Sequence, residues 1–186
     1  MFPEKIRCSW CSSSEIYKNY HDQEWGKPVR DDGTLFEFLV LETFQAGLSW
    51  ITILNKRENF RKAFDNFNYT KIANYNDDKI LDLLQDTGII RNKLKIFSAV
   101  TNAQNFMKIQ EQFGSFSKYI WKFVNDKPIV NFPKKHTDVA STTTLSDKIS
   151  KDLKKRGFKF VGSTVMYAYM QAIGIVEDHI VDCDFK

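Results

Sequence analysis

The chain has 186 residues, of which 42% are hydrophobic and 15% aromatic, and its formal net charge is +4. This length and apolar content favour one domain with one packed core, and the mild positive charge permits a polyanionic partner without requiring one. The amino terminus has no apolar signal segment, and the longest uncharged run, residues 160–176, is too short and too polar to span a bilayer. Three cysteines, an odd number, argue against a disulfide framework. We therefore expect a soluble, cytoplasmic protein without a membrane partner.

Hydrophobic spacing and breaker residues predict helices along most of the chain. Ser14 is expected to cap a short first helix, and Asp31 or Asp32 to cap the apolar helix that carries Glu42. Further predicted helices cover residues 51–67, 71–73, 77–86 (capped by Asn76 or Asp77), 92–107, 115–124, 146–156 and 163–174. Residues 125–144, with two prolines and a Ser/Thr run, are expected to form a loop. No stretch has a convincing strand pattern, so we predict an all-α protein.

One carboxylate, Glu42, interrupts the apolar helix, and a break at Gly47, an apolar Leu48 and the flat ring of Trp50 follow it. A buried carboxylate without a partner is costly. An acid beside an aromatic face suits a pocket for a flat ring that is cationic or bears an amide. The alternative is a satisfied core glutamate near a core tryptophan, which is the more common outcome for such a stretch.

Two thiols and two imidazoles lie near the two ends of the chain: Cys8, His21, His179 and Cys183. The last two are four residues apart, which would place both on one face of a helical turn. Two thiolates with two imidazoles form a closed tetrahedral zinc site of the structural kind, which would tie residues 7–26 to residues 177–184. Cys11 offers an alternative, because its spacing from Cys8 is common to redox pairs and metal ligands. Ordinary core positions are a third interpretation.

A tight turn bounded by Gly157 and Gly162 joins the last two predicted helices, so that residues 146–174 form a helical hairpin. The amides of such a turn and the N-terminus of the second helix can hold a phosphate oxygen. Positive charges surround the turn: Lys154, Lys155, Arg156 and Lys159. The pattern resembles a helix-hairpin-helix, which grips a DNA backbone without reading its sequence. A solvated basic face beside a glycine cap explains the same residues equally well.

Aromatic side chains are concentrated near the proposed ligands and Glu42: Trp10, Tyr17, Tyr20, Trp25 and Trp50. If zinc fixes the amino-terminal segment, that segment can present its rings to a pocket that contains Glu42. The usual alternative is that the rings belong to the core, and for Trp25 we favour that alternative.

Longer motifs occur together along the chain. They are Cys8-Ser9-Trp10, Tyr20-His21-Asp22 with Glu24-Trp25-Gly26, Leu41-Glu42 with Gln45-Ala46-Gly47-Leu48-Ser49-Trp50, residues 87–92, residues 155–162, and Asp178-His179 with Cys183. On these motifs, from about residue 7 to residue 183, the chain resembles the 3-methyladenine DNA glycosylase I (Tag) family. The resemblance implies one domain of two helical lobes over residues 1–186, with the fold of the helix-hairpin-helix DNA glycosylases. It implies a monomeric base excision repair enzyme that hydrolyses the N-glycosidic bond of 3-methyladenine in alkylated double-stranded DNA, leaving an abasic site.

The same resemblance implies roles for particular residues. A structural Zn²⁺ is implied for Cys8, His21, His179 and Cys183. Recognition and release of the base are implied for Glu42 and Tyr20, with stacking from Trp50, Trp10 and Tyr17. DNA contacts are implied for Gln45, Gly47 and Leu48, which would enter the gap left by the flipped nucleotide, and for the hairpin residues Lys155, Gly157, Lys159, Gly162 and Ser163.

One departure from related enzymes and two other functions stay open. Many members of the wider superfamily carry a catalytic aspartate two residues before a histidine, and here Glu177 stands at that place before His179, where it could act as a surrogate base. No lysine nucleophile stands out, so lyase activity at abasic sites is not expected. A zinc-stabilised DNA-binding module without catalysis would use the same hairpin. A thiol redox protein would use Cys8 and Cys11, although no βαβ pattern accompanies them.

Overall fold

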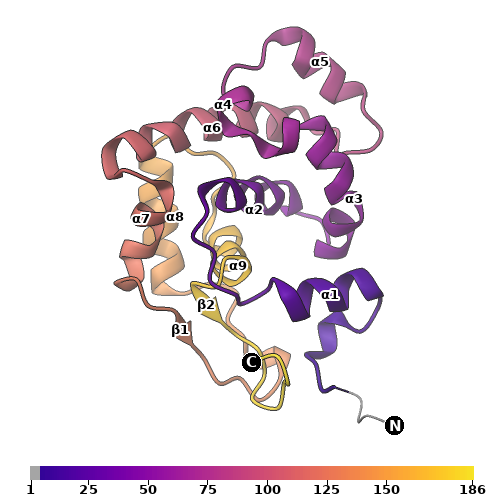
Figure 1. Ribbon diagram of the computed structural model, residues 1–186, viewed down its shortest axis with the longest axis vertical. Helices are drawn as coiled ribbons and strands as arrows, with labels where there is room; N and C mark the ends of the chain where they lie inside the picture. The colour runs from indigo at the N-terminus through magenta and orange to yellow at the C-terminus, as the bar shows by residue number, and fades with distance from the viewer. Residues whose placement is uncertain (1–4) are drawn as a thin grey trace.

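The structure, a computed structural model, describes residues 5–186 and is mostly helical (Figure 1). The helices are α1 Glu15–Gln23, α2 Asp32–Gln45, α3 Trp50–Ala63, α4 Tyr69–Ile72, α5 Asp77–Gln85, α6 Lys93–Phe113, α7 Phe116–Trp121, α8 Thr144–Lys155 and α9 Ser163–Ala172. Short 3₁₀ segments are η1 Ser9–Cys11, η2 Asp65–Phe67, η3 Lys122–Val124 and η4 His136–Asp138, and the strands are β1 Ile129–Val130 and β2 Val176–Glu177. Within residues 5–186, no helix has both the length and the apolar character needed to cross a membrane.

Side-chain caps begin the helices at the predicted positions: Ser14 for α1, Asp31 for α2, Asn76 for α5 and Asn92 for α6. Each cap accepts a hydrogen bond from a backbone amide of the first helical turn, where amides have no partner within the helix. Asp31 rather than Asp32, and Asn76 rather than Asp77, is therefore the capping residue.

Several predicted boundaries differ from the structure. Helix α3 ends at Ala63, before the predicted end, because residues 65–67 have positive φ angles and form η2. Helix α6 continues beyond residue 107 to Phe113 and stops where Gly114 takes a left-handed conformation with φ of 84°. The expectation of no strands was wrong. Strands β1 and β2 pair in parallel, but with two residues each they are too short to show an alternating pattern.

Helix α2 lies at the centre of the molecule beside α9 (Figure 1) and packs against α3, α6, α7 and α9. Most of its side chains are buried, as expected for a helix that is hydrophobic on every side. The Tyr169 hydroxyl of α9 donates to the Leu35 carbonyl over 3.0 Å and joins the two helices. Glu42 is the one charged residue of α2 that is buried, so the core holds an acid within its central helix.

The two ends of the described chain lie together. The Ile6 amide donates to the Asp184 carboxylate over 2.7 Å, and the Asp184 amide donates to the Ile6 carbonyl over 3.0 Å. The segment before α1 therefore contacts the segment after β2, and this contact brings the terminal cysteines and histidines into one region.

Candidate functional site

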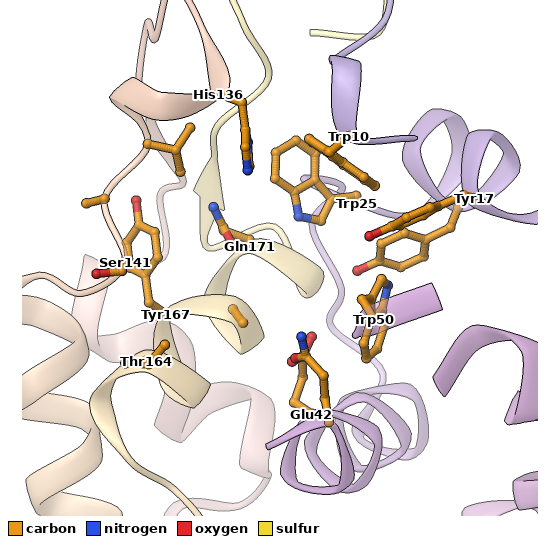
Figure 2. Close-up of a pocket in the computed structure, with 15 residues that line it drawn as sticks. Trp10, Tyr17, Trp25, Glu42, Trp50, His136, Ser141, Thr164, Tyr167 and Gln171 are labelled. Carbon is orange, nitrogen blue, oxygen red and sulfur yellow. The ribbon is translucent and has the colours of Figure 1, made fainter. Parts of the chain in front are cut away.

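A cavity of about 340 Å³ lies between α1, α2, the start of α3, α9 and the segment around η4. One wall is aromatic and consists of Trp10, Tyr17, Tyr20, Trp25 and Trp50. The facing wall is mostly polar or small and consists of His136, Val139, Ala140, Ser141, Thr164, Tyr167, Ala168 and Gln171. Figure 2 shows these walls on opposite sides of the cavity, with Glu42 at its foot. The volume is typical of sites for small ligands.

The aromatic wall is a cluster of rings that come from η1, α1, the turn after α1 and the start of α3. The centroid of Trp10, in η1, lies 4.9 Å from Tyr17 and 5.0 Å from Trp25. Tyr20 of α1 lies 5.3 Å from Trp50, the first residue of α3. Burial raises the pKa of the Tyr20 hydroxyl well above its usual value, and the nearby Glu42 adds to the effect. The hydroxyl of Tyr20 therefore keeps its proton and can donate a hydrogen bond.

Glu42 is only 3% exposed, and its Oε2 atom has no hydrogen-bond partner in the part of the chain that the structure describes. The indole Nε1 of Trp50, which is also buried, has no partner there either. An unmet buried donor or acceptor typically destabilises a protein by about 1–3 kcal/mol, so such groups are rare and need an explanation. A polar ligand in the cavity would provide a partner for the Glu42 carboxyl. This unmet acceptor favours a pocket over the alternative of a satisfied core glutamate.

The charge of Glu42 depends on what occupies the cavity. Burial raises the pKa of Glu42 to about 8. At pH 7 most molecules of the empty protein therefore hold a neutral carboxyl at this position. A cationic ligand would favour the carboxylate form, so the pocket is suited to a ring that carries positive charge or hydrogen-bond donors.

Three of the four predicted metal ligands lie together. One ligand atom each from Cys8, His21 and Cys183 lies within 4.8 Å of the others, and all three residues are buried. The Cys183 Sγ and His21 Nε2 atoms are 3.6 Å apart. Two such ligands on a tetrahedral zinc ion would be separated by about the same distance, given its usual bond lengths. His179 lies beside the group, with its ring centroid 4.6 Å from that of His21, but its ligand atoms are outside the group.

Carboxylates orient both histidines. Asp22 contacts Nδ1 of His21 at 2.8 Å, and Glu177 contacts Nδ1 of His179 at 2.6 Å. Metal-binding histidines characteristically have such a partner, which leaves Nε2 for the metal. Burial raises the pKa of Cys8 to about 12, and the nearby Cys183 adds to the effect. Both thiols can therefore lose their protons at neutral pH only if a cation balances their charge. The residues therefore fit a zinc ion.

The contacts support neither Cys11 as a partner of Cys8 nor Glu177 as a general base. Cys11 lies outside the group of three ligands, and its Sγ donates to the Cys8 carbonyl over 3.1 Å. Glu177 accepts hydrogen bonds from the His179 amide and from Lys186. Burial opposes ionisation of Glu177, but its hydrogen bonds with the His179 ring, the His179 amide and Lys186 prevail and lower its pKa to about 2. Glu177 does not line the cavity. A group so weakly basic and so placed is a poor general base.

The predicted DNA-contacting residues lie on two turns. Helices α8 and α9 form the predicted hairpin, in which Gly157 has φ of +91° and Gly162 caps α9 without a side chain. Lys155 and Lys159 are exposed, whereas the Ser163 hydroxyl lies 2.8 Å from that of Ser146. The second turn follows α2: Gln45 lines the cavity, Gly47 has φ of +81°, and Leu48 is 40% exposed.

The sequence analysis missed the polar wall of the cavity. Thr164, Tyr167 and Gln171 follow one another at helical spacing on α9, so they form one polar face on a helix in which the sequence analysis gave a role only to Ser163. That spacing was the available signal. His136 and Ser141 come from the predicted loop, where no local pattern indicates which side chains face a cavity.

Fold and site together define a mostly helical protein with an aromatic pocket that contains a buried acid. Comparison with known proteins narrows this class. Residues 10–186 match the methyladenine glycosylase family. The chain is 45% identical over 177 residues to DNA-3-methyladenine glycosylase 1 of Escherichia coli (strain K12), covering 95% of each chain. It is 47% identical over 180 residues to DNA-3-methyladenine glycosylase of Haemophilus influenzae (strain ATCC 51907 / DSM 11121 / KW20 / Rd), covering 97% of each. The chain therefore belongs to the methyladenine glycosylase family.

Solved structures agree with this assignment. The fold matches that of 3-methyladenine DNA glycosylase I from Staphylococcus aureus, a structure described as showing the basis of 3-methyladenine recognition, with a TM-score of 0.94 at 37% identity. The match covers 97% of this chain and 96% of that one. A tyrosine-to-phenylalanine variant of 3-methyladenine DNA glycosylase I, solved in complex with 3-methyladenine, matches with a TM-score of 0.94 at 36% identity, covering 97% of each chain.

Proposed function

We propose that the protein is a DNA repair glycosylase that hydrolyses the N-glycosidic bond of 3-methyladenine in alkylated DNA and leaves an abasic site. The observation that carries this proposal is the buried, unpartnered Glu42 carboxyl at the foot of an aromatic cavity. Its relatives are named for this activity, and a non-catalytic DNA-binding module would have no use for such a pocket.

The chemistry of the lesion explains the residues. 3-Methyladenine carries a positive charge while it is attached to deoxyribose, so its glycosidic bond is already weak. Glu42 balances this charge and accepts hydrogen bonds from the base, and Tyr20 donates a hydrogen bond. Trp50, Trp10 and Tyr17 supply aromatic surface for the ring. Neutral adenine, which lacks the charge, is held less well.

The enzyme is a hydrolase without lyase activity. A lyase forms a Schiff base through an amine, and no lysine is among the described residues that line the cavity. Because the cationic base is a good leaving group, water attacks the sugar with little activation. The displaced base leaves as neutral 3-methyladenine, and the water's second proton passes to solvent.

Base release from methylated duplex DNA tests the proposal directly. The wild-type protein should release 3-methyladenine and leave unmodified adenine in place, as measured by chromatography of the released bases. Duplex binding without release of any base would favour the non-catalytic module instead.

We also propose that Cys8, His21, His179 and Cys183 hold a structural Zn²⁺ ion. Support comes from the buried group of three ligands and from the carboxylates behind both histidines. The ion, when bound, cross-links the two terminal segments, and four nitrogen and sulfur ligands leave no open position for a reacting water. It would thereby hold the aromatic wall that η1 and α1 contribute.

Two turns are proposed to contact DNA in different ways: the hairpin turn between α8 and α9, residues 156–162, and the turn after α2, residues 45–48, called the Leu48 turn. The amides of the α8–α9 turn, flanked by Lys155 and Lys159, grip a backbone phosphate in the manner of a helix-hairpin-helix. Leu48, exposed three residues after the cavity-lining Gln45, fills the gap that the flipped nucleotide leaves.

Replacing Lys159 by Ala should weaken binding to all duplexes alike, because phosphate contacts do not read sequence. A plot of log affinity against log salt concentration has a negative slope, and this slope should become shallower by about one unit. Fluorescence anisotropy at several salt concentrations measures it. Lys62→Ala, on the exposed side of α3, is the matched control and should leave the slope unchanged. An altered base selectivity with an unchanged salt slope would contradict this role for Lys159.

A further inference from the structure

Helix α6 holds the backbone of both turns through two buried polar side chains. The ammonium group of Lys95 donates to the carbonyls of Phe44 and Ala46 over 2.8 and 2.6 Å. The Asn102 side chain accepts a hydrogen bond from the Lys159 amide over 2.8 Å and donates to the Lys159 carbonyl over 3.1 Å. Lys95 is 6% exposed and Asn102 is 0% exposed. Neither residue lines the cavity.

Lys95 completes the end of α2. The last carbonyls of a helix have no intrahelical partner, and the negative end of the helix dipole lies there. Here a buried cation supplies donors to two of the carbonyls, at the point where Gly47 turns the chain toward Leu48. Loss of the cation would leave these carbonyls without their partner and free the turn.

Asn102 fastens the hairpin turn to the same helix. The oxygen and the nitrogen of its side-chain amide bond the N–H and the C=O of one residue of the turn, so the backbone of Lys159 is fixed in position and orientation. Asn105, one helical turn further along α6, lies against Gly157, where an added Cβ would come within 3.0 Å of its Nδ2 atom. The hairpin turn therefore sits directly on α6.

Lys95 and Asn102 share one face of α6 because seven residues are about two helical turns. Along the axis they are about 10 Å apart. We propose that α6 fixes the spacing between the Leu48 turn and the hairpin turn, with Lys95 and Asn102 as positioning residues for excision from duplex DNA. This inference rests on the proposed function, in which one turn fills the gap in the duplex and the other grips a phosphate of the same duplex. Because the duplex sets the distance between gap and phosphate, both turns engage only when their spacing is correct.

A double-mutant cycle with Lys95→Met and Asn102→Ala tests the proposal. Two quantities are measured: the single-turnover rate of 3-methyladenine release from duplex DNA, and the affinity for free 3-methyladenine. Each single variant should lower the rate by about ten- to a hundredfold, while affinity for the free base stays within about twofold. The double variant should be no slower than the slower single variant. Loss of either contact is enough to let the distance between the two turns vary, so loss of the second contact adds nothing.

The controls separate the outcomes. Effects of residues this far apart normally multiply, so a double variant with the product of the two losses would overturn the proposal. A parallel fall in free-base affinity would also overturn it, since the pocket itself would then have been damaged. Lys93→Met, exposed on the same helix, should retain the wild-type rate, and Lys95→Arg should recover most of it. Asn102→Ser buries no charge and keeps one hydroxyl for the Lys159 backbone, so it should give an intermediate rate and provides a milder comparison if Asn102→Ala does not fold.

Failure of the proposed function itself would look different. In that case the wild-type protein would release no 3-methyladenine from duplex DNA. Wild-type release together with unimpaired single variants would instead contradict only the role of α6.

Discussion

Glu42→Gln is expected to lower the rate of 3-methyladenine excision by about ten- to a hundredfold at a pH above 8, where the wild-type carboxyl is ionised. The glutamine keeps the shape of the side chain and one acceptor but cannot carry the charge that balances the cationic base. A charge-assisted hydrogen bond is worth about 1.5–3 kcal/mol, and about 1.4 kcal/mol corresponds to a factor of ten in rate. The rate is measured with excess enzyme on a duplex that carries a single lesion.

The matched control for this change is Glu111→Gln, an exposed glutamate on α6, which should excise the base at the wild-type rate. Binding of Glu42→Gln to undamaged duplex should hardly change, because the proposed phosphate contacts lie on the hairpin. Circular dichroism establishes that the fold is retained. Excision by Glu42→Gln at the wild-type rate would show that Glu42 has only a packing role.

Loss of a zinc ligand is expected to have the second large effect. The wild-type protein should contain close to one zinc ion per chain, and Cys183→Ser should not retain it. The free energy of unfolding of this variant should be lower by about 3 kcal/mol or more, because the terminal segments would no longer be cross-linked. Excision should fall as well, since Trp10 and Tyr20 belong to the segment that the ion would fix. Metal content is measured by atomic absorption, and stability by denaturant unfolding.

Cys11→Ser provides the matched control, because Cys11 is buried near the group of ligands but outside it. This variant should keep its metal. Loss of metal from Cys11→Ser together with retention by His21→Ala would show that Cys8 and Cys11 form the binding pair. Absence of zinc from protein with all four proposed ligands intact would contradict the metal site altogether.

Local chemistry predicted much of this molecule. Helix caps such as Ser14 and Asn92 were identified because the need for a partner at the first helical turn is a local property. The gathering of Cys8, His21 and Cys183 could be predicted because a metal site needs particular ligands, wherever they lie in the chain. Glu42 was recognised as unusual because a carboxylate is costly in an apolar helix.

What the sequence could not supply depends on tertiary contacts. The two-residue strands form only because the segment after η3 meets the segment after α9, and neither has a pattern of its own. His136 enters the cavity wall from a loop whose path is set by distant packing. Lys95 resembles an ordinary surface lysine in the sequence, and only the structure shows it buried against the end of α2.

The pH dependence of kcat/KM tests most directly whether Glu42 recognises the charge of the base. This parameter reports ionisation of the free enzyme, in which burial raises the pKa of Glu42 to about 8. Below that pH, the ionised fraction rises about tenfold with each unit, and kcat/KM of the wild type should rise in proportion before levelling off above it. Glu42→Gln should lack this rise, because it has no group to ionise there. The same pH profile for both proteins would contradict the account.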